Sequence, residues 1–184
     1  DKVIVRDVYK NGEKVVSNGK TLCFDMPKIN DALEKKVRSS FNLPMLSSSD
    51  FVVDYNGKRK CHVISLVDGQ LLTDDLVSDI DFDCNNGIDI EHDILKIAVI
   101  ERHHNTGHIG NAFIKGIGLK EGAIASSVAH DSHNLIVIGT NTDDMAFAAN
   151  RIRELGGGIV SVKNGKVVAE MPLPIGGLMS CETA

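Results

Sequence analysis

The chain has 184 residues, of which 42% are hydrophobic and 24% are charged, and this composition predicts a packed protein rather than a disordered one. The net charge is −5 at pH 7 and the pI is about 5.8, with no basic stripe interleaved with aromatic residues, so we expect no nucleic-acid binding. No apolar run reaches membrane-spanning length, so we expect no membrane partner.

The four cysteines are widely spaced and form no C-x-x-C pair. This spacing favours neither a zinc ribbon nor a disulfide scaffold, and reduced thiols are typical of a cytoplasmic protein. The chain opens on "DKVIVRDVYKNGEKVV" without Met, so we expect a piece of a longer protein.

Three Asn-Gly pairs stand between runs in which apolar and polar residues alternate. They are Asn11-Gly12, Asn56-Gly57 and Asn164-Gly165. Both residue types tolerate positive φ, which tight hairpin turns require. The sequence therefore predicts hairpins over residues 3–20, 51–66 and 158–171.

Helices are fewer. Apolar residues recur every four positions from Ile29 to Phe41, and this period predicts a helix over 27–41 with one buried stripe, capped by Asp25 and with Pro27 in its first turn. A second helix is predicted over 142–155, between Thr142-Asp143-Asp144 and the glycines that follow Leu155. A short helix is also expected near 107–115.

Buried strands are predicted over 94–102 and 134–140, and the Asp-rich segment 68–93 is interpreted as a solvated acidic edge. Together these elements predict an α+β fold, with a mixed or mainly antiparallel sheet, several hairpins and a few helices packed on it. We divide the chain into a strand pair (1–20), a helix and linker (21–50) and an α+β domain (51–184).

Two polar segments are candidates for function. "AHDSHN" contains His130, Asp131, His133 and Asn134 and directly precedes a predicted strand. These side chains could bind a metal or carry out acid–base chemistry, but two histidines from one loop make an incomplete metal site, and a polar loop that caps the strand is the alternative.

The second candidate is "ERHHNTGHIG", Glu101 to Gly110, at the end of the predicted strand 94–102, where Glu101, Arg102, His103, His104 and His108 form a dense polar cluster. Strand ends often form sites because the strand fixes the backbone while the side chains face a cleft. Arg102 could orient a substrate carbonyl or hold a carboxylate by paired hydrogen bonds. The alternative is a solvated loop with an internal ion pair.

The runs "KIAVIERHH", "KGIGLKEGAIASSVAHDSHN" and "LGGGIVSVKNGKVVAEMPLPI" make the sequence similar to the C-terminal portion of bacterial adenine deaminases. "FNLPMLSSSDFVV" resembles the segment that leads into that portion, so the resemblance covers roughly residues 21–180.

The resemblance implies the metal-dependent amidohydrolases, whose members in this family hydrolyse adenine to hypoxanthine and ammonia in purine salvage. It implies that Mn, Fe or Zn is held in an upstream (β/α)₈ barrel, which needs about 250 residues and is therefore missing here. Residues 1–20 would belong to the β-domain that flanks the barrel.

The resemblance therefore predicts a domain without a cofactor of its own and inactive alone, which walls the active site of the barrel. The expected partners are adenine, that barrel and further copies in a homo-oligomer. His130, Asp131 and His133 are the predicted catalytic support, and Glu101, Arg102, His103, His104 and Asn134 are predicted to contact substrate. The alternatives are a non-catalytic assembly module and a small self-sufficient metallohydrolase.

Overall fold

The computed structural model describes residues 3–22, 30–130, 132–180 and 182. The predictions for Asp25, Pro27, Ile29 and Asp131 lie outside these residues. The chain divides into two compact units, residues 1–34 and 35–184, and each is described by itself. Over the described residues, no helix combines the length and the apolar character that crossing a membrane would require.

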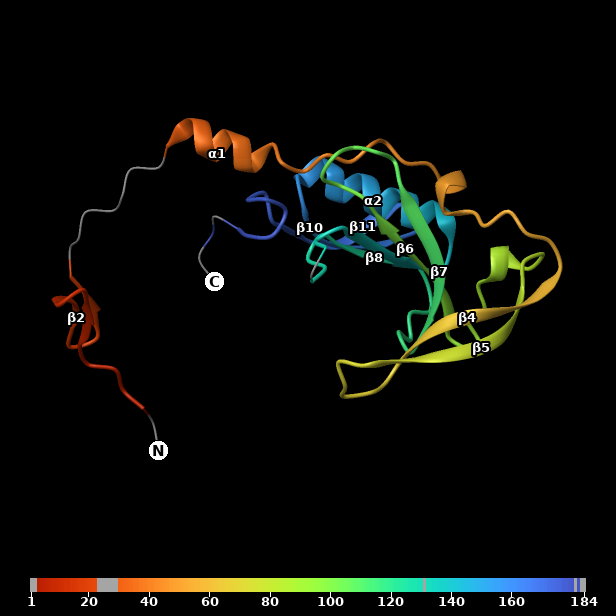
Figure 1. Cartoon of the computed structure of the whole chain (residues 1–184), viewed down its shortest axis with the longest axis horizontal. Helices are drawn as coiled ribbons and strands as arrows, with labels where there is room; N and C mark the ends of the chain where they lie inside the picture. Colours follow the sequence, from red (N-terminus) through yellow and green to blue (C-terminus); the bar gives the residue numbers. More distant parts are fainter. Residues whose placement is uncertain (1–2, 23–29, 131, 181, 183–184) are drawn as a thin grey trace. The chain divides into compact units, whose positions relative to one another are not determined.

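The first unit holds a three-stranded antiparallel sheet in the order β1-β2-β3 (Figure 1). Its strands are β1 (Val8–Lys10), β2 (Glu13–Ser17) and β3 (Lys20–Thr21). Asn11 and Gly12 join β1 to β2 with φ of 51° and 84°, so the predicted hairpin is confirmed. Asn18 and Gly19 turn β2 into β3 in the same way, with φ of 51° and 73°.

The first helix is shorter than predicted. α1 spans Asp31–Arg38, and Asn30 caps it because its side-chain oxygen accepts the N–H groups of Ala32 and Leu33. No residue of α1 is buried, and Leu33 is 60% exposed. The predicted buried stripe is therefore wrong within α1, whereas Phe41, beyond the end of the helix, is half-buried and packs against the core of the second unit.

The second unit is built on an eight-stranded sheet in the order β11-β10-β8-β9-β6-β7-β4-β5. Its strands are β4 (Lys58–Leu66), β5 (Thr73–Asp81), β6 (Ile94–Ile100), β7 (Ile109–Lys115), β8 (Ala123–Ser126), β9 (Leu135–Gly139), β10 (Gly158–Lys163) and β11 (Lys166–Pro172). All neighbours pair antiparallel except β4 and β7, which are parallel. The predicted α+β fold and the hairpin at Asn164-Gly165 are confirmed.

Two predictions of local structure are wrong. Asn56-Gly57 closes no hairpin, because the backbone N–H and C=O of Val53 are bonded to the side chain of Asn86, and β4 pairs with β5 instead. Residues 107–115 contain strand β7 rather than a helix, because β6 supplies a continuous antiparallel partner along the whole of β7. Long-range pairing outweighs local propensity in both cases.

Helix α2 (Thr142–Leu155) is confirmed at both of its predicted ends. Asn141 caps its N-terminus by accepting the N–H of Asp144 at 2.7 Å, and Gly156 ends it with φ of 71°. The buried face of α2 packs on β8, β9 and β10 (Figure 1). The apolar side chains of this core come from both layers, and they include Ala125, Leu135, Val137, Met145, Ala149, Ile152, Val160 and Val162.

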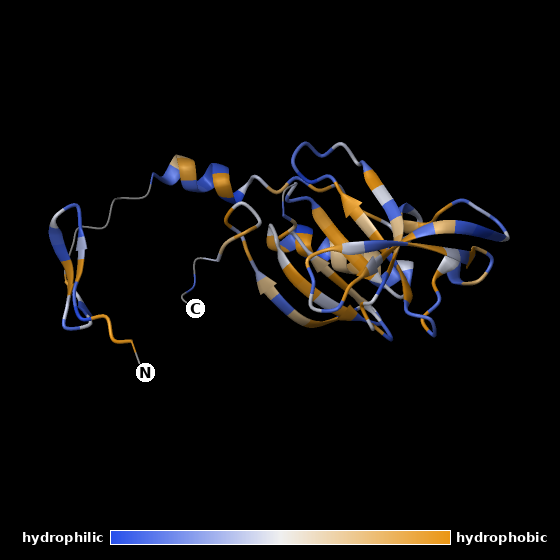
Figure 2. Cartoon of the chain, turned by 60° about the horizontal axis from the view of Figure 1, so that its bottom comes forward, coloured by the Kyte–Doolittle hydropathy of each residue, from blue (hydrophilic) through white to orange (hydrophobic). Residues whose placement is uncertain are grey.

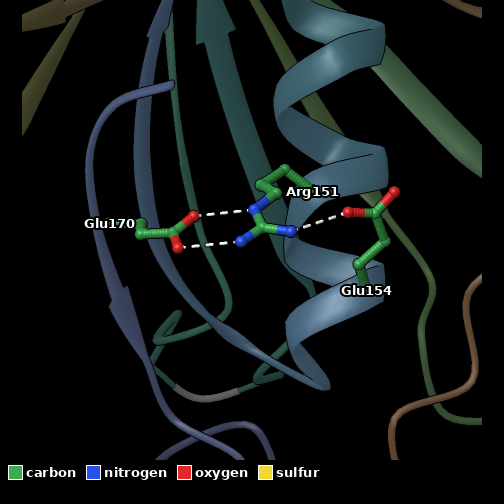
Figure 3. Close-up of polar contacts among 3 residues, drawn as sticks. All are labelled: Arg151, Glu154 and Glu170. Atoms are coloured by element: carbon green, nitrogen blue, oxygen red, sulfur yellow. Dashed lines mark hydrogen bonds and ion pairs between the residues drawn. The ribbon is translucent and has the colours of Figure 1, made fainter. Parts of the chain in front are cut away.

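Two side-chain contacts attach α2 to its surroundings. Arg151 donates from Nε and Nη2 to the two oxygens of Glu170 on β11, at 2.7 and 2.8 Å, and from Nη1 to Glu154 (Figure 3). Asn150 both accepts from and donates to the backbone of Leu46. The helix is thus joined to the outer strand β11 and to the linker before the short 3₁₀ helix η1 (Ser48–Phe51).

A lysine lies in the core on the same side of the sheet. Lys96 on β6 is fully buried, and its Nζ donates to the carbonyl of Phe51 at 2.8 Å and to the side-chain oxygen of Asn86. Burial lowers its pKa from 10.5 to about 8. It forms no ion pair with any residue that the structure describes. Lys96 therefore anchors η1 and the segment around η2 (Asn85–Gly87) to the sheet.

We call the sheet face opposite α2 the open face. Part of it is covered by the loop residues Ile88, Ile90, Ile117 and Leu119, which pack on Leu95, Ile97 and Ile114. Figure 2 shows hydrophobic colouring along the central strands and more hydrophilic colouring along β4 and β5. Apolar side chains therefore line both faces at the centre of the sheet.

Candidate functional site

The two candidate segments lie at the same end of the sheet. The loop 101–108 joins β6 to β7, and the loop 127–134 joins β8 to β9. Because β6 lies between β7 and β9, these loops are neighbours. We call them together the strand-end cluster.

Arg102 holds the cluster together from inside. It is only 2% exposed, and its Nε donates to the carbonyl of His133 at 2.6 Å while Nη1 donates to the carbonyl of Gly176 at 3.0 Å. Its guanidinium carbon lies 5.0 Å from the centre of the Phe41 ring. Burial lowers the pKa of this guanidinium. Its hydrogen bonds therefore join three chain segments.

His103 makes a second link between the loops. Its Nε2 lies 2.9 Å from the carbonyl oxygen of Ser132, and because a carbonyl only accepts, Nε2 carries the proton. Asn42 adds a third segment, since its N–H donates to the Arg102 carbonyl and its side chain donates to the His103 carbonyl. The His103 ring is thereby fixed against the loop that contains His130.

Glu101 organises its own loop. Its carboxylate accepts the backbone N–H groups of His103, His104 and Thr106 and the hydroxyl of Thr106. Burial raises the pKa of this carboxyl, but the donors, led by Thr106, outweigh burial and lower it from 4.5 to about 2. Glu101 is therefore ionised at neutral pH and binds the turn that follows it.

The two histidines of the second loop differ in exposure. The His130 side chain is exposed, whereas His133 is half-buried, and their ring centres lie 6.0 Å apart. His133 has φ of 49°, and its N–H donates to the Ala129 carbonyl at 2.6 Å. Its Nδ1 is buried and has no partner among the described residues. Asp131, predicted between them, lies outside the described residues.

Asn134 borders a shallow hollow of about 420 Å³ on the open face. Its side-chain oxygen is buried without a partner in the described structure. The hollow is lined by Val99, Glu101, His108, Ile109, Gly110 and Asn134. Its volume falls within the range of about 300–1,000 Å³ that is usual for small-molecule sites.

The structure thus brings the predicted residues together at one end of the sheet but in different environments. His103, His104 and His130 are exposed, Glu101, His133 and Asn134 are half-buried, and Arg102 is buried. Among the described residues, no group of three His, Cys, Asp or Glu side chains is arranged to hold a metal ion. The described cluster therefore presents polar side chains of differing exposure at one end of the sheet.

Sequence reasoning misses two supporting residues, Asn42 and Ser127, whereas His108, which lines the hollow, belongs to the predicted polar cluster. The buried Ser127 hydroxyl donates to the Gly177 carbonyl at 2.6 Å and accepts the N–H of Gly158 at 2.8 Å. His108 lies in the same polar run as "ERHH", whereas Asn42 and Ser127 carry no local sequence signal for these distant contacts.

A second hollow, of about 510 Å³, lies away from the cluster beside β5 and the segment 84–90. Its polar lining includes Lys58, Asp79, Asp81 and Asp89. Each of these side chains already has a polar partner: Lys58 pairs with Asp81, Lys60 with Asp79, and the His92 ring is hydrogen-bonded to Asp89. We therefore place the candidate site at the strand-end cluster.

Comparison with known proteins identifies related sequences. A family model described as "Adenine deaminase C-terminal domain" matches residues 70–184, which is well over half of the chain. The similarity to adenine deaminases that the sequence motifs predict is therefore confirmed.

Individual relatives extend the similarity over nearly the whole chain. Proteins named adenine deaminase from Lysinibacillus sphaericus and Brucella anthropi are 42% and 43% identical over 176 and 174 residues, in each case 94% of this chain. One from Petrotoga mobilis is 42% identical over 182 residues, 99% of this chain. The matched regions are 29%, 31% and 31% of those proteins, so this chain spans less than a third of their length.

Proposed function

The chain belongs to the adenine deaminase C-terminal domain family, and from this premise we propose that it is part of an enzyme that converts adenine and water to hypoxanthine and ammonia. The observation that carries the proposal is the identity of 42–43% with proteins of that name over 94% of the chain. In this proposal residues 1–20 belong to the β-domain beside the catalytic barrel, 21–50 form a helix and linker, and 51–184 form the C-terminal domain.

The catalytic metal ion, whether Mn, Fe or Zn, is assigned to the barrel outside this chain. A closed metal site needs three or four ligands, whereas the spacing of His130 and His133 on one loop offers two. When bound, such an ion supplies a water-derived nucleophile. The residues of this chain are assigned a different task, which is to enclose the purine and present polar groups to it.

The strand-end cluster is the surface we assign to this task. In the proposal His103, His104, His130 and Asn134 offer donors and acceptors to the base, and Asp131 and His133 complete the loop from which His130 projects. Arg102 and Glu101 act as positioning residues, because their polar groups bond to the backbone of these loops. Enclosing the site would also exclude water from it.

The remaining parts of the proposal concern partners and location. We assign adenine as the substrate, the barrel of the same polypeptide as the main partner, a homo-oligomer as the assembly and the cytoplasm as the location. The described cysteines Cys61 and Cys84 are free thiols, which is consistent with a reducing compartment.

The test is the substitution His130→Ala in the full-length polypeptide. We expect the kcat/KM for ammonia release from adenine to fall about 10- to 100-fold, in line with the loss of a positioned polar or acid–base group. Metal content and thermal stability should not change, because His130 is exposed and the metal is assigned elsewhere.

His92→Ala is the matched control. His92 is an equally exposed histidine just before β6, at the end of that strand opposite to the cluster, and it pairs with Asp89. The control should keep the parent kcat/KM. If His130→Ala and His92→Ala both keep the parent kcat/KM, His130 has only a structural role.

A further inference from the structure

A row of paired residues crosses six neighbouring strands on the open face. Each member is the register partner of the next. In spatial order the members are Met171, Ile159, Ser126, Ile136, Val99 and Gly110. With strands about 4.8 Å apart, this open-face row is about 24 Å long.

The row is mostly apolar and partly exposed, with one polar side chain, Ser126, and with Ser126 and Ile136 half-buried. Met171 is 49%, Ile159 41% and Val99 38% exposed, and the row contains no charged side chain. The part of the open face farther from the strand-end cluster is covered by loop residues, as described above. Exposed apolar side chains that are grouped along one sheet face are a feature of contact surfaces.

The row runs directly into the candidate site. Val99 and Gly110 at its end also line the hollow that contains Glu101, His108 and Asn134. The Glu101 carboxylate nearby is ionised, and its oxygens accept four hydrogen bonds from its own loop. Whatever covers the row therefore also borders the strand-end cluster.

The outer strands of the sheet are poor alternatives for docking. The β10–β11 pair has a register shift after Ser161, and β11 ends in Pro172. Strand β5 at the other side carries Asp74, Asp75, Asp79 and Asp81. Bulges, prolines and charges are the features by which strands at sheet edges resist pairing with another chain, so the face rather than an edge is left for contact.

We propose that the open-face row is the surface on which the rest of the adenine deaminase polypeptide packs, an inference that rests on the proposed function. Over two thirds of each relative lies outside the region matched by this chain, which provides a partner large enough to cover the row. A second copy of this chain on the row would instead enclose the hollow between two domains whose described residues lack a metal-binding group.

The test measures how fast a thiol on the row reacts in the full-length polypeptide. Ile159→Cys and Met171→Cys are made separately, and N-ethylmaleimide labelling is followed at the peptide level by mass spectrometry. Leu72→Cys in the β4–β5 turn is the control, because Leu72 is 74% exposed and away from the row.

We expect both row thiols to react at least about tenfold more slowly than the control, with no dependence on protein concentration. Exposure in this domain alone, 41% against 74%, accounts for only about a twofold difference. Reaction within about twofold of the control would overturn the proposal. Protection that disappears when the protein is diluted to monomers would also overturn it, because a second copy would then be the occupant.

Ammonia release from adenine is measured on the same samples. Slow labelling without deamination would support the packing surface and contradict the assigned reaction. Deamination with fast labelling would support the assigned reaction and contradict the packing surface. Two row positions are used so that a local disturbance at one of them does not decide the result.

Discussion

At the scale of single residues, the charged side chains in the interior hold loops to the sheet. Arg102 and Lys96 both donate mainly to backbone or amide oxygens rather than to carboxylates. A buried cation that is bonded in this way fixes the position of the backbone, but its desolvation lowers stability. The two residues therefore favour a defined geometry over maximal stability.

Lys96 gives a pH-dependent prediction. Its folded pKa of about 8 lies below the value of 10.5 for an exposed lysine, so between these pH values the unfolded chain binds more protons. The free energy of unfolding should therefore rise between about pH 8 and pH 10.5, by on the order of 1–3 kcal/mol. Below pH 8 the ammonium is charged in both states and the cost of burying it is fully present.

Urea unfolding of Lys96→Met at pH 7.5 and pH 10 measures this effect. The variant should lack the rise, whereas Lys60→Met, which removes an exposed lysine of β4, should retain it. The same pH dependence in the parent chain and in Lys96→Met would show that another group is responsible.

At the scale of elements, the N-terminus of α2 and the β10–β11 turn share one carboxylate. Asp144 is 3% exposed and accepts hydrogen bonds from the Asn141 side chain and from the N–H groups of Asn164 and Gly165. Burial raises its pKa, but these donors outweigh burial and lower it. Its stabilising contribution is therefore present above the ordinary carboxyl pKa of 3.8 and is lost as the pH falls below that value.

Asp144→Asn should lower the free energy of unfolding by about 2 kcal/mol at pH 7, because an amide cannot accept all of these hydrogen bonds. Asp143→Asn is the control, since Asp143 is exposed in the same turn of α2 and should change stability little. Denaturation at pH 7 and pH 3 checks both expectations, and the difference between the parent and Asp144→Asn should shrink at the lower pH. Equal losses in the two variants would contradict the bridging role.

The sequence predicts those elements whose signal is local. Asn11-Gly12 and Asn164-Gly165 predict their hairpins because the turn chemistry is complete within the dipeptide. The ends of α2 are predicted by the polar run 142–144 and by the glycines after Leu155, although the residue that caps the helix is Asn141. The hairpin predicted at Asn56-Gly57 is wrong because the backbone of the nearby Val53 is hydrogen-bonded to the side chain of Asn86, 33 residues away. Strand β7 was mistaken for a helix because its assignment depends on pairing with β6.

The candidate site shows the same limit. The clustering of "ERHH" with "AHDSHN" follows from their places at the ends of adjacent strands, and strand-end position is visible in the sequence. The burial of Arg102 is not visible there, because it depends on contacts with Gly176 and Phe41, which are distant in the chain. Its positioning role could therefore be inferred only from the structure.

At the scale of the whole molecule, the two faces of the eight-stranded sheet differ in how far they are covered. One sheet face is closed by α2, the other exposes the open-face row, and the strand-end cluster lies at the end of that row. The family match begins at residue 70, while the relatives align over 94% of the chain or more. The similarity therefore extends beyond the named domain into the preceding segments.

The most direct measurement is ammonia release from adenine, made with Mn²⁺ on the full-length polypeptide and on this chain alone, with bound metal quantified in both. We predict deamination and stoichiometric metal only in the full-length protein. Deamination by this chain alone, or a full-length protein that binds metal and leaves adenine unchanged, would contradict the account.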